Sequence, residues 1–131
     1  KPDEILYVGL QSLHEYQQKF LDDVGVNYKI QTQEFISNEE IGVFLRKFDH
    51  VLVHLDIDVL DEQLFHSTYF ANPELVGDGS GGGKMTLEKL SEVLRVIEGQ
   101  SDIVGLTIAE YLPFDEHRLH NMFAGIRMFM D

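Results

Sequence analysis

Short apolar runs alternate with segments of helical periodicity along the 131 residues, and this alternation constrains the fold more than any other feature of the sequence. A strand, helix, strand, helix order is typical of α/β proteins with a mainly parallel sheet. We therefore predict a three-layer αβα fold with about four strands, in one domain or fragment spanning residues 1–131. The predicted strands are residues 5–10, 28–31, 51–55 and 103–108.

Three of the intervening segments begin with residues that typically cap a helix. Ser12 and Ser37 each precede a glutamate by three residues, which is the spacing of a capping box. Thr86 can cap a third helix through its hydroxyl. Around the second box, Ile36 and Ile41 have the spacing of a hydrophobic staple. An apolar stripe predicts a last helix, and its members are Leu119, Met122, Phe123, Ile126 and Met130.

A long loop is predicted over about residues 59–85, because no period is evident there and glycines accumulate. Loops of this length in compact domains are usually functional or disordered. The segment does not match a phosphate-binding loop, since Asp78 stands where that motif needs Gly and Met85 where it needs Ser or Thr. We interpret the loop as a flexible connection whose backbone can pass close to a ligand or subunit. Its glycines are Gly77, Gly79, Gly81, Gly82 and Gly83.

The composition argues against several classes of function. Ten Lys and Arg against 23 Asp and Glu give a net charge of −13, so we expect neither nucleic acid nor an anionic membrane as a partner. The chain has no Cys, which excludes disulfides and thiolate zinc sites, and we expect a cytoplasmic location. No apolar run approaches the roughly 20 residues of a membrane-spanning helix. Because the sequence does not begin with Met, we expect it to be a piece of a longer protein.

The predicted strand 51–55 is followed by two carboxylates, Asp56 and Asp58. Residues two apart on a strand point to the same side, with Cα atoms about 6.6 Å apart. Carboxylates held in this way repel each other unless a cation lies between them, and Mg²⁺ and Mn²⁺ prefer such oxygen ligands. The alternative interpretation is a pair of solvated or helix-capping aspartates at a strand-to-loop turn.

Glu110 follows the last predicted strand in the same way. Ligands of open α/β sheets bind beyond the carboxyl ends of the strands, and parallel strands bring these ends to one edge. We therefore expect Glu110 to lie at the edge that carries Asp56 and Asp58. His54, two residues before Asp56, is a candidate to hydrogen-bond a metal ligand on the side that faces away from the metal. No Ser/His/Asp arrangement can be assembled from the spacing of the other histidines.

The string Val53-His54-Leu55-Asp56-Ile57-Asp58-Val59-Leu60-Asp61 resembles the late motif of the ureohydrolase superfamily, which includes arginase, agmatinase and formimidoylglutamase. In that motif a strand ends in Asp-x-Asp and another Asp follows shortly. A Gly-Gly segment, a helix beginning at Thr86 and a strand ending in Ala109-Glu110-Tyr111-Leu112-Pro113 keep the order of the family. Residues 5–10 resemble the strand that begins the second half of these proteins. The chain thus resembles the C-terminal half of the arginase fold.

This resemblance implies that Asp56 and Asp58 are ligands of a pair of manganese ions. It also implies that Glu110 receives the cationic group of a small guanidino or formimino substrate. The implied reaction is hydrolysis of a linear amidine C–N bond by metal-activated hydroxide. The family's early Gly-Gly-Asp-His and Asp-Ala-His-x-Asp motifs, which supply the remaining metal ligands, do not occur in this sequence. We therefore expect the parent protein to be a binuclear manganese hydrolase and the isolated chain to be inactive.

Two alternative functions stay open. The first is a non-catalytic interaction module derived from a ureohydrolase, since a cut parallel sheet exposes an edge and apolar surface that tend to pair with another chain. Both this hypothesis and the first one predict either a homo-oligomer or association with a missing N-terminal half. The second alternative is a magnesium-dependent phosphatase with an Asp nucleophile. It is less favoured, because that motif normally ends the first strand of its domain, whereas Asp56 follows two strand-helix units.

Overall fold

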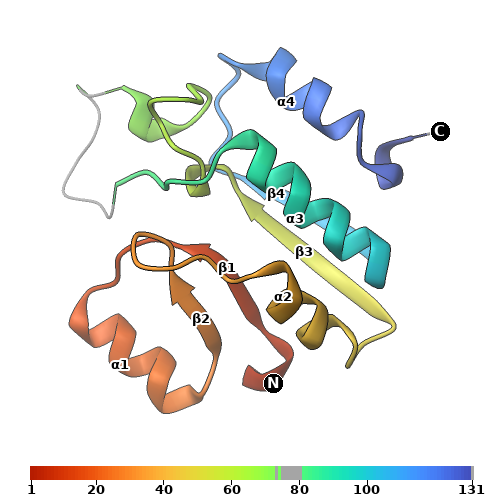
Figure 1. The fold of residues 1–131 in the computed structure, drawn as a ribbon. Helices are drawn as coiled ribbons and strands as arrows, with labels where there is room; N and C mark the ends of the chain where they lie inside the picture. Colours follow the sequence, from red (N-terminus) through yellow and green to blue (C-terminus); the bar gives the residue numbers. More distant parts are fainter. Residues whose placement is uncertain (73, 75–80, 131) are drawn as a thin grey trace.

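The fold is α/β, with strands that pair in parallel and helices between them (Figure 1). The computed structural model describes residues 1–72, 74 and 81–130. The predicted α/β class and the four predicted strands are confirmed. The strands are β1 (Leu6–Leu10), β2 (Asn27–Ile30), β3 (His50–Asp56) and β4 (Asp102–Ala109).

The four strands form two hydrogen-bonded pairs rather than one continuous sheet. β1 pairs with β2, and β3 pairs with β4, both in parallel. The β3–β4 pairing runs from His50 opposite Asp102 to Asp56 opposite Ala109, with one irregularity after Val51. Both strands of this pair therefore end together at the same edge.

The helices pack mainly through α3, the longest of them. The helices of the described residues are α1 (Glu15–Val24), α2 (Asn38–Leu45), α3 (Leu87–Gln100) and α4 (Glu116–Phe123). On α3, Leu90 and Leu94 belong to a core cluster with Leu55 of β3, whereas Val93 belongs to a second cluster with Ile41 of α2. One helix thus joins the two parts of the core. None of the described helices is long and apolar enough to cross a membrane.

The predicted caps of α2 and α3 are confirmed. The Ser37 hydroxyl accepts a hydrogen bond from the Glu40 backbone N–H at 3.2 Å, and the Glu40 carboxylate accepts one from the Ser37 N–H at 2.9 Å. Ile36 and Ile41 are both buried in one cluster, as a hydrophobic staple requires. The Thr86 hydroxyl accepts a hydrogen bond from the backbone N–H three residues later, at 3.1 Å.

The predicted start and end of two other helices are wrong. α1 begins at Glu15 after His14, not at Ser12, and the Gln17 side chain accepts a hydrogen bond from the His14 N–H at 2.9 Å. Ser12 lies outside the helix, and the residue before it, Gln11, is hydrogen-bonded to Asp58 beyond β3. The last helix ends at Phe123, and the remaining residues of its predicted stripe, Ile126 and Met130, flank the short 3-10 helix Arg127–Phe129.

The described part of the predicted long loop is largely packed. It begins with the 3-10 helix Ile57–Val59, and its first and last parts meet at a bridge between Leu60 and Met85. Phe65 is buried within the core cluster below this bridge. Gly77 and Gly79, and with them the part of the loop for which we predict flexibility, lie outside the described residues.

One face of the β3–β4 pair carries exposed apolar side chains. Leu52 is 79% exposed and Val104 is 57% exposed, whereas Leu55, on the other face, is buried. Both faces of a parallel sheet are normally covered. The described residues therefore cover only one face of this pair, and they do not supply the second outer layer over Leu52.

The two candidate serine caps give a matched test of the helix starts. We expect Ser37→Ala to lower the free energy of unfolding by about 1 kcal/mol, because an N–H at the start of α2 loses its acceptor. Ser12→Ala should change it by less than about 0.5 kcal/mol, because Ser12 is exposed and caps no helix. Urea unfolding followed by circular dichroism measures both values. Equal losses for the two variants would contradict the observed start of α1.

Candidate functional site

The ends of three strands meet at one edge of the molecule and carry its candidate site. Asp56 is the last residue of β3, and Asp58 lies in the following 3-10 turn. Glu110 directly follows Ala109, the β4 residue paired with Asp56. Gln11 directly follows β1 and reaches Asp58. The structure thus brings together the three acidic residues that the sequence singles out.

Asp58 is held in place from two sides. The side-chain amide of Gln11 donates hydrogen bonds to its Oδ1 at 2.8 Å and to its backbone carbonyl at 3.0 Å. The same carbonyl accepts a hydrogen bond from the Gly83 N–H at 2.7 Å. These bonds fix both the backbone and the carboxylate of Asp58. The sequence analysis missed Gln11, although its position directly after a predicted strand was a signal for it.

The carboxylates of this edge act on one another electrostatically. Partial burial raises the pKa of Asp58 above its ordinary value, and the hydrogen bond from Gln11 opposes that increase. The neighbouring Asp56 and the negative charge of Glu110 raise this pKa further. The ionised form of Asp58 is therefore disfavoured by its surroundings, and a cation at this edge would relieve the repulsion.

Asp56 contributes a buried oxygen without a hydrogen-bond partner among the described residues. Buried carboxylate oxygens are normally paired, so an unpaired one needs an explanation. A hard cation is one such explanation, because Mg²⁺ and Mn²⁺ take carboxylate oxygens as ligands. The donor chemistry of Asp56 and Asp58 therefore fits a metal of this kind.

The acidic edge is not a complete metal site. Within the described ranges, no group of three or more His, Asp or Glu side chains is arranged to hold a metal ion. His54 does not add a partner for Asp56, because its Nδ1 is hydrogen-bonded to the Thr107 hydroxyl at 2.6 Å. Two aspartates alone leave most positions of a hard cation to water.

Glu110 has a backbone conformation that is unusual for its residue type. Its φ is 56°, in the left-handed region, which costs a residue with a Cβ roughly 1–2 kcal/mol. The following residue, Tyr111, is fixed by a bridge to Thr68, and Leu112 donates a hydrogen bond to the Ser67 carbonyl at 2.8 Å. Such strain tends to occur at functional sites, and here it directs the exposed Glu110 away from the path of β4.

The end of the glycine segment packs against the chain itself. A Cβ on Gly83 would lie 1.8 Å from the Val59 carbonyl oxygen, so only glycine fits there. Gln31 holds the neighbouring residue, because its Oε1 accepts a hydrogen bond from the Lys84 N–H at 2.8 Å. Its amide also donates to the Gly9 carbonyl of β1 at 2.7 Å. Gly83 thus allows two segments of this chain to lie in close contact.

A small pocket of about 310 Å³ opens beside the acidic edge. It is formed by the connection from β1 to α1, and its wall includes Gln11, His14 and Gln17. Gln11 is the residue that links this pocket to Asp58, and none of the three acidic residues lines it.

Comparison with solved structures identifies the architecture. The arginase from Bacillus caldovelox matches 100% of this chain with a TM-score of 0.73 at 19% identity. The chain has the arginase fold. The arginase from Helicobacter pylori matches 95% of it with a TM-score of 0.70, and the formimidoylglutamase from Bacillus subtilis matches 95% with a TM-score of 0.67, both at 18% identity. The resemblance to ureohydrolases is thus confirmed at the level of the fold.

The arginase fold is present only in part. The chain spans 42–44% of the length of these three neighbours. No protein-family profile and no curated protein sequence matches it. Similarity at this level of identity establishes the fold and leaves the chemistry to be argued from the residues.

The raised pKa of Asp58 makes stability depend on pH in a defined direction. Without metal, we expect the free energy of unfolding to decrease as the pH rises from the pKa of an unfolded aspartate towards the higher folded-state pKa, because the folded carboxyl must then ionise. Asp58→Asn should remove this decrease and be the more stable protein at neutral pH, since Asn still offers an oxygen to Gln11. Urea unfolding over a pH series with a chelator measures the effect. Asp49→Asn, at the opposite end of β3, should keep the wild-type slope.

The strain at Glu110 predicts an inverted order of two substitutions. Glu110→Gly should be more stable than Glu110→Ala by about 1 kcal/mol, because glycine adopts a positive φ without penalty. At Thr107, which lies in regular β4, the order should reverse and the glycine variant should be the weaker. Urea unfolding of the four variants measures both differences in the free energy of unfolding. The same order at both positions would show that the conformation of Glu110 is not strained.

Proposed function

We propose that this chain forms part of a binuclear manganese hydrolase that cleaves the C–N bond of a linear amidine, in a guanidino or formimino substrate. The observation that carries the proposal is the meeting of Asp56, Asp58 and Glu110 at one edge of a fold shared with arginase and formimidoylglutamase. The isolated chain is inactive in this proposal, because its own residues supply only part of the metal site.

Asp56 and Asp58 are the proposed manganese ligands. The unpaired oxygen of Asp56 and the disfavoured ionisation of Asp58 both support this role, since a cation would satisfy each of them. When bound, the metal pair supplies a hydroxide nucleophile at neutral pH. Gln11 orients Asp58 through one hydrogen bond to its carboxylate and one to its backbone carbonyl.

Glu110 is the proposed contact for the cationic end of the substrate. Its carboxylate is exposed and acts on Asp58 through its charge, so it lies close enough to attract a guanidinium or formimino group towards the metal ligands. A charge-assisted hydrogen bond from such a group to a carboxylate is stronger than a neutral one. The net charge of −13 also favours a cationic substrate over an anionic one.

The remaining metal ligands have to come from residues other than those described. The proposed source is an N-terminal half of the same protein, or a further subunit. The exposed Leu52 and Val104 support an association of this kind, because they leave apolar surface for another segment to cover.

The same exposed surface supports the second candidate, a non-catalytic module that binds another chain. The two proposals differ in the role of the acidic edge. A module needs the apolar face and would tolerate loss of both aspartates, whereas a part of a hydrolase requires Asp56 and Asp58. Discovery of the missing His and Asp motifs in the parent protein would favour the hydrolase.

Manganese binding tests the proposed role of the acidic edge. We expect paramagnetic Mn²⁺ to broaden amide NMR signals around residues 56–58 and 110 selectively, with weak affinity, because a site short of ligands binds metal poorly. The double variant Asp56→Asn/Asp58→Asn should lose this broadening, and Asp49→Asn should retain it. Calorimetry that showed tight, stoichiometric binding to this chain alone would contradict the half-site. Selective broadening that survived in the double variant would contradict the assignment of the ligands.

A further inference from the structure

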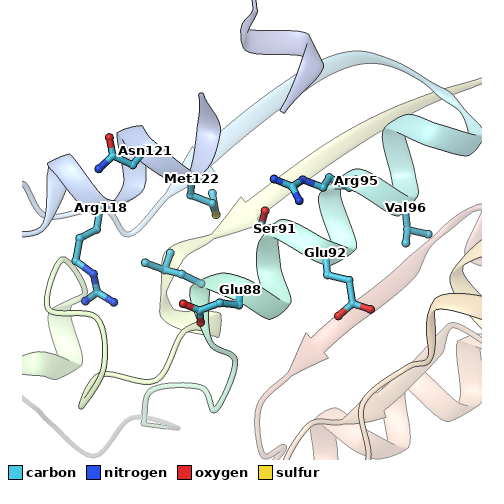
Figure 2. A pocket seen from close by; sticks show the side chains of 9 residues that line it. Glu88, Ser91, Glu92, Arg95, Val96, Arg118, Asn121 and Met122 are labelled. Atoms are coloured by element: carbon cyan, nitrogen blue, oxygen red, sulfur yellow. The ribbon is translucent and has the colours of Figure 1, made fainter. Parts of the chain in front are cut away.

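A groove of about 710 Å³ separates α3 from α4 (Figure 2). From α3, Ser91 and Arg95 extend into it, and Asn121 and Met122 belong to α4 on the opposite side. The groove includes none of the acidic residues of the candidate metal site. Any function of this groove therefore goes beyond the proposed hydrolase.

The acidic side chains that line the groove already have partners. The N–H groups at the start of α3 and the Thr86 hydroxyl hold the pKa of Glu88 below its ordinary value. Glu92 accepts a hydrogen bond from Asn38 and another from Lys89, the latter at 3.2 Å. Among the described residues, neither carboxylate forms an ion pair with an arginine on the α4 side of the groove. Glu88 and Arg118 only attract each other through their charges at longer range.

The two arginines of the groove differ in their contacts. Arg118 donates hydrogen bonds to the Leu64 carbonyl and to the Asp115 carboxylate, the latter at 3.3 Å. For Arg95 the described residues provide no hydrogen bond and no ion pair. Among the charged groups that line the groove, the Arg95 guanidinium is thus the one whose donors are unused within this part of the chain. Arg95 is exposed, so its guanidinium is open to a ligand from solvent.

The position of the guanidinium is also defined. Arg95 reaches from α3 to the turn that follows α4, where a Cβ on Gly125 would come within 2.9 Å of its Nη2. The missing side chain at Gly125 leaves room for the guanidinium at this place. Carbonyls at the end of α4 favour a nearby cation, so a purely structural role is the competing explanation for Arg95.

We propose that this groove binds a small monocarboxylate with an apolar body, and that Arg95 is its charged contact. A guanidinium matches a carboxylate with two parallel N–H donors. Arg95 is the one cation of the groove without a partner among the described residues, and Glu88 and Glu92 also line the groove, so the groove fits one negative charge and disfavours polyanions. The Ser91 hydroxyl, which lies next to Arg95 on α3, offers a further hydrogen bond. The apolar lining consists of Leu87, Val96 and Met122.

Benzoate is a suitable probe, and benzamide is its neutral control of the same shape. We expect benzoate, followed by two-dimensional NMR, to produce saturable shifts at Ser91, Arg95 and Asn121, and benzamide to produce none. Arg95→Gln should weaken benzoate binding at least tenfold, because a hydrogen-bonded charge pair is lost. Arg46→Gln, which removes an exposed arginine at the end of α2, should bind benzoate like the wild type.

A second variant keeps the test independent of the first. Asn121→Asp adds a negative charge to the lining of the groove and should weaken benzoate binding by repulsion of the carboxylate. The proposal is overturned if benzoate shifts no signals in the groove, if benzamide binds equally well, or if Arg46→Gln weakens binding as much as Arg95→Gln. It is also overturned if sedimentation shows a dimer that Arg95→Gln dissociates, because a second copy would then occupy the groove.

Discussion

The parallel pairing of β3 with β4 is the constraint on which the other features depend. Its register places Asp56 opposite Ala109, so that Asp58 and Glu110 emerge together at one edge. Because both strands point the same way, the connection between them must cross over, and it does so through α3, whose side chains reach both parts of the core. The acidic edge is thus a consequence of how the strands pair, and a shift of one residue in register would turn Asp56 to the opposite face.

The features that sequence could predict are those that neighbouring residues decide. The apolar run 51–55 and the capping residues Ser37 and Thr86 act within a few positions, and the structure has them as expected. Ser12 has the same local pattern as Ser37 but caps no helix, and its neighbour Gln11 makes a long-range hydrogen bond to Asp58 instead. The role of Gln11, the lack of a partner for Arg95 among the described residues and the separation into two strand pairs depend on contacts between distant residues. Local patterns carry no information about such contacts.

The fold and the proposed reaction of this chain rest on different observations. An identity of 18–19% to arginases and a formimidoylglutamase establishes the architecture, whereas the proposed reaction depends on a few carboxylates at the strand ends. Burial raises the pKa of Asp58 most, and the charges of Asp56 and Glu110 raise it further, so gathering these carboxylates has an energetic cost. A chain that keeps such an arrangement gives up stability at its edge, which is a common cost of a functional site. In the proposed hydrolase this loss of stability serves metal binding, whereas in the proposed module it serves no reaction.

The hydrogen bond between Gln11 and Asp58 joins residues 47 positions apart, and this has a consequence for the order of folding. Contacts between distant positions require the closure of a long loop before they contribute any stability. Gly83, which lies against the Val59 carbonyl and donates a hydrogen bond to the Asp58 carbonyl, closes a second such loop. We therefore expect the helices to form early and the contacts of the acidic edge to form last. A chain that stalls during synthesis would then have folded helices before its candidate metal ligands are in place.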